Sequence, residues 1–197
     1  RKLELFLEMH PDGEGYKKAG AINGITEQNQ STLKKLFAAS IVCSDTILQT
    51  DKKNDKYWEF IGNPTEAAIL IAAEKFGLRI DRVKDDFERQ YSIPFSSSNK
   101  TMTVWAKSKS SSFYSENQHF HFMKGAPVKV IDQCKYIFKD SQVVEMSTEE
   151  REEVLAVNDQ MAREGYRVLA IAFSPSDGNV EAEKERNDLV LLSMVAM

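Results

Sequence analysis

Residues 119–134 read HFHFMKGAPVKVIDQC, and this stretch contains the passage from a strand to a helix. The aromatic run at its start is typical of a strand, and it ends on Lys124 and Gly125. Pro127 then suits the first turn of a helix that continues to Cys134. A glycine lets a ligand approach the backbone closely, and the lysine beside it supplies one cation. We therefore predict that this strand end lies at a binding site.

Histidine and phenylalanine alternate along the same strand, His119 and His121 with Phe120 and Phe122. Successive side chains of a strand point to opposite faces, so each pair shares a face. Two histidines at this spacing can share a metal ion, but no cysteine or acidic cluster accompanies them. We expect the histidines to face the surface and the phenylalanines the core, with no metal site.

The composition is that of a globular domain. The 197 residues are 42% hydrophobic and 28% charged, enough for one domain with a real core. The net charge of −4 and the lack of a long Lys/Arg block argue against nucleic-acid binding. The two separated cysteines indicate a reducing compartment, and no run approaches the about 20 apolar residues of a spanning helix. Because the chain begins at Arg1 without a signal peptide, we expect a soluble piece of a longer protein.

Two of the predicted helices lie in the first half of the chain. Apolar residues at three- and four-residue steps predict a helix from Ser31 to near Leu48. The clearest helix covers 62–77, where Asn63 can cap the first turn and Glu66 follows three residues later. That spacing is typical of a capping box, in which the glutamate accepts from the backbone of the cap residue.

A further helix is predicted at 147–165, with Ser147 as its cap and Glu150 three residues later. The predicted strands are 57–62, 90–95, 100–107, 119–125, a pair within 136–146, 166–174 and 188–197. Residues 1–30 are turn-rich, and we expect an irregular lead-in or a strand pair there. Strands joined by short loops predict an α+β domain over 1–197, with a mainly antiparallel twisted sheet flanked by helices.

Four stretches stand out together as a pattern. They are GNPTEAAI (62–69), IPFSSSNKTMTV (93–104), MKGAP (123–127) and GYRVLAIAF (165–173). In order and spacing they resemble the nucleotide-binding (N) domain of P-type cation-transporting ATPases, whose pattern runs G-x-P-T-E-x-A-L, F-x-S-x-x-K-x-M, K-G-A-P-E and R-x-L-A-x-A. The likeness spans roughly Leu33 to Met197, and CSD at 43–45 is similar to the family's C-N-D. Each motif is weak alone, but four in register are specific.

The resemblance assigns two residues to the adenine ring. Phe95 ends a strand before small serines, so it can offer an open aromatic face for stacking. The alternative is a core phenylalanine, since aromatic residues mostly serve cores. In the resemblance Lys124 lines the adenine pocket, and Gly125 lets the ligand come close. The alternative for Lys124 is a solvated surface lysine.

The remaining assignments concern the adenine edge and the phosphates. The resemblance implies that Lys100 contacts the nucleotide near the phosphates and that Arg167 reaches the phosphate tail, a task suited to its fixed charge. Glu66 matches the glutamate that meets the adenine amino group, although the capping-box role competes for the same carboxylate.

Three positions depart from the family pattern. Ser97 stands where many relatives carry an arginine that adds a phosphate contact, which implies weaker binding of phosphate. Asn99 replaces the arginine that is common just before the lysine. Val128 replaces the acid of K-G-A-P-E, which we interpret as the loss of a structural contact.

No D-K-T-G-T motif is present, so no aspartate stands in the context of a phosphorylated nucleophile. The resemblance therefore implies a domain without catalytic residues. It would bind MgATP, with Mg²⁺ carried by the nucleotide, and present the γ-phosphate to an aspartate in a separate phosphorylation domain. Residues 188–197 would form the strand that leads back to that domain, so the isolated chain should be inactive.

Pro127 favours the cation-pump branch, most like the calcium pumps. The resemblance then implies an actuator domain in the same parent chain and a place at the cytosolic face of the endoplasmic reticulum or plasma membrane. A sodium pump, a proton pump or a lipid flippase is the alternative within the superfamily. The alternative from another class is a protein-interaction module that uses the loops at 107–118 and 176–187 without any nucleotide.

Overall fold

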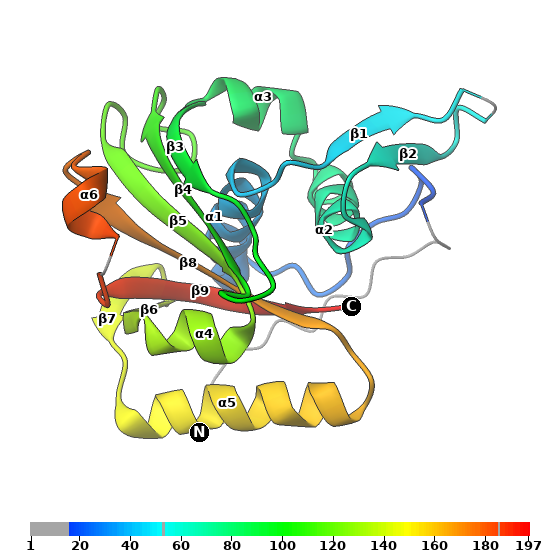
Figure 1. Cartoon of the computed structure of the whole chain (residues 1–197). Helices are drawn as coiled ribbons and strands as arrows, with labels where there is room; N and C mark the ends of the chain where they lie inside the picture. Colours follow the sequence, from blue (N-terminus) through cyan, green and yellow to red (C-terminus); the bar gives the residue numbers. More distant parts are fainter. Residues whose placement is uncertain (1–15, 53, 185) are drawn as a thin grey trace.

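A computed structural model of the chain describes residues 16–52, 54–184 and 186–197. Its centre is a seven-stranded sheet with the order β3-β4-β5-β8-β9-β6-β7 (Figure 1). These strands are β3 (Phe87–Ile93), β4 (Thr101–Ser108), β5 (His119–Gly125), β6 (Cys134–Lys139), β7 (Gln142–Glu145), β8 (Val168–Ser176) and β9 (Leu189–Ala196). A separate antiparallel hairpin contains β1 (Ile47–Thr50) and β2 (Trp58–Ile61).

Neighbouring strands of the large sheet are antiparallel except for β6 and β9, which run parallel. The predicted α+β class with a mainly antiparallel sheet flanked by helices is confirmed. The parallel pair lies where β9 enters the sheet between β6 and its antiparallel neighbour β8.

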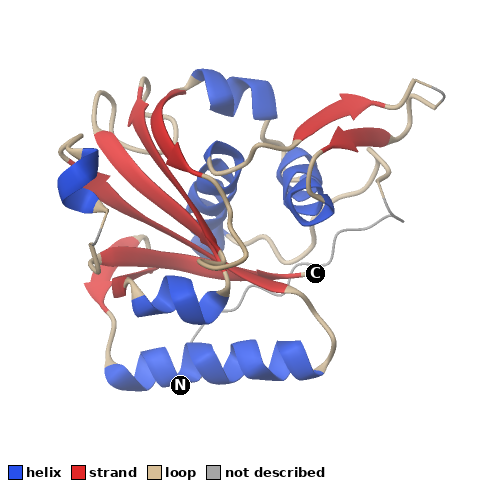
Figure 2. Ribbon diagram, viewed as in Figure 1, coloured by secondary structure: helices blue, strands red, loops and turns tan. Residues whose placement is uncertain are grey.

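Helices cover both faces of this sheet (Figure 2). They are α1 (Glu27–Val42), α2 (Pro64–Lys75), α3 (Ile80–Asp85), α4 (Pro127–Asp132), α5 (Thr148–Arg163) and the short α6 (Val180–Glu183). On one face α1 packs against β5, β8 and β9, with α2 and α3 beside it. On the other face α4 and α5 pack against β8. The chain therefore builds two apolar layers around one sheet.

Each layer has its own hydrophobic cluster. Leu36 and Phe37 of α1 join Phe122 and Ile171 of the sheet in the larger cluster. The smaller cluster includes Ile131 of α4 with several small or branched residues of β8 and β9. The prediction that phenylalanines of β5 face the core is confirmed, because Phe120 and Phe122 are 3% and 0% exposed.

The same prediction placed His121 at the surface, and that was wrong. His121 is 2% exposed and stacks on Trp105, with ring centroids 4.5 Å apart. The indole of Trp105 donates to the carboxylate of Glu183 in α6, so the α6 segment covers this face of the sheet. Neither ring nitrogen of His121 has a hydrogen-bond partner in the described part of the chain, and burial lowers the pKa of His121 to about 4.

The predicted helix at 31–48 was wrong at both ends. α1 begins after Thr26, whose side chain forms a capping box with Asn29, and it ends at Val42. Leu48 belongs to β1, where it lies opposite Phe60. Residues 27–30 of the predicted irregular lead-in are thus helical, and residues 1–15 of it lie outside the described residues.

The other helix signals gave mixed results. The capping box of Ser147 and Glu150 in α5 is confirmed, as is the cap of α2 by Asn63. The sequence did not predict α3 and α6, which are short and polar, so they have weak periodicity.

Candidate functional site

The predicted binding residues lie at one end of the strands in the large sheet, and we call this end the sheet edge. Here β3 and β5 end while β4 and β8 begin, and Thr101 lies opposite Gly125, which in turn lies opposite Ala170. Lys100 and Arg167 are at the ends of their strands, so this register brings them near Lys124. The beginning of α2 joins the same edge through its contacts with two of these side chains.

The first of these contacts is a buried ion pair between Lys124 and Glu66. Lys124 Nζ lies 2.6 Å from Glu66 Oε1, and the two side chains are only 6% and 12% exposed. A solvated surface position for Lys124 is therefore excluded. Burial alone would raise the pKa of Glu66, but the Lys124 charge and the hydrogen bonds to the carboxylate outweigh it and lower this pKa.

The second oxygen of Glu66 is held by donors from the chain after α1. Ser44 Oγ and Thr46 Oγ1 each donate to Glu66 Oε2 at 2.8 Å, and the Thr46 backbone N–H donates at 3.2 Å. The sequence did not predict this role for Ser44 and Thr46. The one signal was CSD at 43–45, which matched a family motif without indicating what its side chains contact.

These contacts replace the capping box that the sequence suggested for Glu66. Asn63 caps α2 through its own side chain, which accepts from Thr65 N at 2.8 Å. The backbone N–H of Asn63, which a capping-box glutamate would bind, donates instead to Thr46 Oγ1 at 3.0 Å. The carboxylate of Glu66 is thus directed toward Lys124 and away from its own helix end.

Gly125 has a packing role that the sequence did not predict. A Cβ at this position would lie 2.3 Å from the Lys100 carbonyl oxygen and 2.7 Å from Thr101 Cα. The same carbonyl accepts from Ala126 N at 2.9 Å. The space beside Gly125 therefore holds protein backbone, and glycine lets the loop 94–100 lie directly against the end of β5. A contact of Gly125 with a ligand stays a prediction.

The loop 94–100 presents Phe95 to solvent. Phe95 is 56% exposed, so the alternative that it belongs to the core is wrong. The following turn is closed by Lys100 N, which donates to Ser96 O at 2.7 Å, and by Asn99 N, which donates to Ser96 Oγ at 3.1 Å. Lys100 has a left-handed backbone with φ of 57°, and its side chain is exposed.

Arg167 lies beside the beginning of α2. Its guanidinium donates to Thr65 Oγ1 at 2.7 Å, next along the chain from Glu66. Its backbone exchanges two hydrogen bonds of 2.9 Å with Met197, just before β8 begins. The exposed guanidinium is therefore held in place from both its side chain and its backbone.

Together these residues offer three kinds of contact at one edge. Phe95 supplies an exposed aromatic face, Glu66 and Lys124 supply a buried acceptor and donor, and Lys100 and Arg167 supply exposed positive charge. Such a set suits a flat, polar ring that carries an anionic tail. Among the described residues, no group of three His, Cys, Asp or Glu side chains could hold a metal ion.

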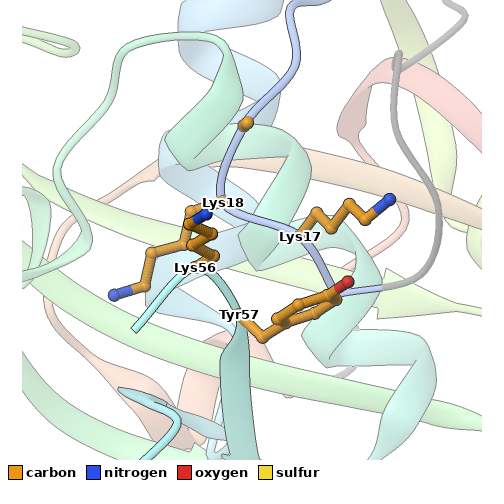
Figure 3. A pocket seen from close by; sticks show the side chains of 5 residues that line it. Lys17, Lys18, Lys56 and Tyr57 are labelled. Atoms are coloured by element: carbon orange, nitrogen blue, oxygen red, sulfur yellow. The ribbon is translucent and has the colours of Figure 1, made fainter. Parts of the chain in front are cut away.

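A separate hollow of about 240 Å³ lies by β2 and contains none of the predicted residues. Lys17, Lys18, Ala19, Lys56 and Tyr57 line it. Figure 3 shows the side chains of Lys17 and Lys56 pointing apart, so their charges do not converge on one point. Within the described ranges of the chain, no helix is both long and apolar enough to span a bilayer.

Comparisons with known proteins show which family the chain resembles. Residues 32–197 match the family model described as P-type ATPase, cytoplasmic domain N. Calcium-transporting ATPase 1 of Lactococcus lactis is 30% identical over 175 residues, which cover 88% of this chain and 18% of that protein. Calcium-transporting ATPase type 2C member 1 of Bos taurus is 28% identical over 171 residues, or 87% of this chain and 16% of that protein. The chain thus spans less than a fifth of the length of these relatives.

Proposed function

The chain belongs to the family of the cytoplasmic N domain of P-type ATPases, and on this premise we propose that it binds ATP at the sheet edge that carries Phe95 and Lys124. The observation that carries this proposal is the buried pair of Glu66 and Lys124, with Oε1 and Nζ 2.6 Å apart. Burying two charges costs desolvation free energy, so such a pair is weak evidence for stability. This ion pair lies at the sheet edge that also carries an exposed aromatic ring and two exposed cations, and ligand binding accounts for the presence of a pair that contributes little to stability.

Each part of ATP has a matching partner in this proposal. Adenine stacks on Phe95, because base–aromatic stacking needs an open ring face. The carboxylate of Glu66 accepts from the 6-amino group, and the ammonium of Lys124 donates to a ring nitrogen. Lys100 and Arg167 approach the phosphates, and the guanidinium gives a planar donor set for phosphate oxygens. Gly125 keeps the Phe95 loop against the strand end.

Magnesium enters as part of MgATP. A magnesium ion keeps several waters and is commonly held by phosphates together with one or two carboxylates. The described residues of this site contain one carboxylate, Glu66, and it is already bonded to Lys124, Ser44 and Thr46. We therefore assign the metal to the phosphates and to a separate phosphorylation domain.

The proposed task of the chain is positioning. It holds ATP so that the γ-phosphate reaches an aspartate in the phosphorylation domain, and orientation of this kind lowers the barrier to phosphoryl transfer. Because the matched relatives are calcium-transporting ATPases, we propose a calcium pump as the parent protein. Its phosphorylation and actuator domains would be the partners, and this single domain would lie on the cytosolic side of the membrane.

A chemical-shift titration with ATP, ADP and adenosine tests the proposal. We expect high-micromolar to millimolar affinity, roughly −4 to −5 kcal/mol, because a few stacking and rim contacts carry the binding. The largest shifts should come from residues around Phe95, Lys124 and Arg167. Unchanged spectra at millimolar ATP would overturn the proposal and favour a protein-interaction module, and changes confined to the loops 107–118 or 176–187 would place the nucleotide away from Phe95.

A further inference from the structure

We propose that Ser44 and Thr46 are positioning residues that fix the Glu66 carboxylate, and thereby make the site prefer adenine to bases that carry a carbonyl at the same edge. This inference rests on the proposed function, since it concerns how the ATP site distinguishes one purine from another. Neither residue is expected to touch the nucleotide itself.

The hydrogen bonds of Glu66 leave little free acceptor capacity. An ionised carboxylate has about four lone-pair sites, two on each oxygen. Oε2 receives three donors, from Ser44 Oγ, Thr46 Oγ1 and Thr46 N, so it is saturated. Among the described residues, Oε1 receives only Lys124 Nζ. One acceptor position therefore remains, and it lies on the oxygen that faces Lys124.

The two positioning residues are themselves well anchored. Ser44 and Thr46 are 2% and 1% exposed and follow directly after α1. The Thr46 hydroxyl accepts from Asn63 N at 3.0 Å while it donates to Glu66, so it joins the end of α1 to the beginning of α2. Gly62 permits this approach, because a Cβ there would lie 2.7 Å from Thr46 Oγ1. The carboxylate of Glu66, which lies on α2, is consequently held by the segment between α1 and β1.

A carboxylate fixed in this way discriminates by hydrogen-bond direction. Adenine presents a 6-amino donor, which fits the remaining acceptor on Glu66 Oε1. Guanine and hypoxanthine present a carbonyl oxygen at that position, so two acceptors face each other. A site built to hydrogen-bond one group rejects an analogue that lacks it, because buried polar groups are left unpaired. Without Ser44 and Thr46 the carboxylate could rotate away and relieve the mismatch.

The test compares the affinities of the whole chain for ATP and ITP, which differ at this purine position. In the unmodified chain we expect ATP to bind at least about tenfold tighter than ITP, as a matched hydrogen bond should provide. The double variant Ser44→Ala/Thr46→Val should lose most of this ratio, and Ser44→Thr, which keeps the hydroxyl, should retain it. The matched control is Ser40→Ala, since Ser40 is equally buried in α1 but donates to Leu36 O.

The outcomes separate the two proposals. If the unmodified chain binds neither nucleotide, the proposed ATP site itself fails. If it binds ATP and ITP equally, the positioning role fails while ATP binding stands. The same conclusion follows if the double variant keeps the ratio of the two affinities unchanged, as the control Ser40→Ala is expected to do. Should the double variant not fold, the Thr46 amide of the unmodified chain gives the answer. This amide donates to Oε2, so it should shift more with ATP than with ITP, and an equal shift contradicts the proposal.

Discussion

The ion pair of Lys124 and Glu66 has unequal consequences for its two members. Glu66 keeps its bonds to Ser44 and Thr46 if Lys124 is lost, whereas Lys124 has no other hydrogen bond among those found in the described residues. Breaking a buried pair leaves an uncompensated charge, which costs more than the pair contributes. The same side chains therefore link the stability of the domain to the chemistry of its proposed adenine pocket.

We predict that Lys124→Met destabilises the chain by roughly 2–4 kcal/mol, somewhat less than a fully unsatisfied buried charge would, because three donors still hold Glu66. Urea unfolding followed by circular dichroism measures this change. Lys129→Met is the matched control, because Lys129 is exposed on α4 and should change stability by about 0.5 kcal/mol or less. Equal effects of both variants would show that the pair is not buried in solution.

Substitutions of Phe95 and Arg167 should produce a crossed pattern of binding. Phe95→Ala should weaken ATP and adenosine alike by about 1–3 kcal/mol, since it removes the stack on the base. Arg167→Ala should weaken ATP and leave adenosine almost unchanged, because the guanidinium meets only the phosphates. Titrations of both ligands against each variant measure this pattern. Because Phe95 is 56% exposed, its loss should leave the melting temperature nearly unchanged. Normal binding of adenosine by Phe95→Ala would place the base elsewhere.

At the scale of elements, the α6 segment covers a buried histidine, His121, whose pKa is lower in the folded chain than its ordinary value. Glu183 of α6 accepts from Trp105 and Ser176, and Arg186 bonds to the same carboxylate. His121 lies beneath this layer, stacked on Trp105. The hydroxyl of its cross-strand neighbour Ser174 also has no hydrogen-bond partner among the described residues. The pKa of His121 is lowered to about 4, first by burial and against the opposing charge of Glu183.

This arrangement predicts acid sensitivity with a defined origin. Between about pH 6.5 and pH 4 the unfolded chain binds a proton on His121 that the folded chain does not, so stability falls as the pH falls through this window. The loss should reach roughly 3 kcal/mol at the acidic end, the value of a shift of this size. Urea unfolding at a series of pH values measures it.

The variant His121→Phe keeps a ring on Trp105 and removes the proton site, so it should flatten the pH dependence in this window. His119→Gln provides the control on the same strand, because His119 is only partly buried and its ring is hydrogen-bonded to Gln90. If His121→Phe loses stability on acidification as steeply as the unmodified chain, other groups cause the effect.

At the scale of the whole molecule, the chain has residues proposed to bind ATP but no aspartate in the context of a phosphorylated nucleophile. We predict that the purified chain neither hydrolyses ATP above background nor forms an acid-stable phosphoenzyme with labelled ATP. The physical reason is the missing D-K-T-G-T context, since an acyl phosphate requires a specific carboxylate in line with the γ-phosphate. Turnover that copurifies with the chain through further steps, and that Phe95→Ala diminishes, would contradict this assignment.

The sequence predicted the parts of the molecule that local rules determine. β5, the Asn63 cap and the Ser147 capping box each depend on a few neighbouring residues, so their patterns are visible in the chain. Phe95 needed the family resemblance, because an aromatic residue alone more often indicates a core. Its exposure then agreed with the predicted role.

The features that the sequence missed depend on contacts between distant segments. Glu66 has the spacing of a capping box, but its carboxylate is bound by residues 20 and 58 positions away. His121 has the alternation of a surface residue, yet the α6 segment covers that face. In both cases a tertiary contact overrides a local preference, and no period in the sequence encodes it.

The paired backbones of Arg167 and Met197 give the domain a mechanical linkage. The two residues exchange both of their N–H···O bonds at 2.9 Å, so neither can shift relative to the other without breaking them. A displacement of residue 197 would consequently displace the backbone of Arg167, whose guanidinium lies beside Thr65. The position of Met197 is thus coupled to that of the cation proposed to bind the phosphates.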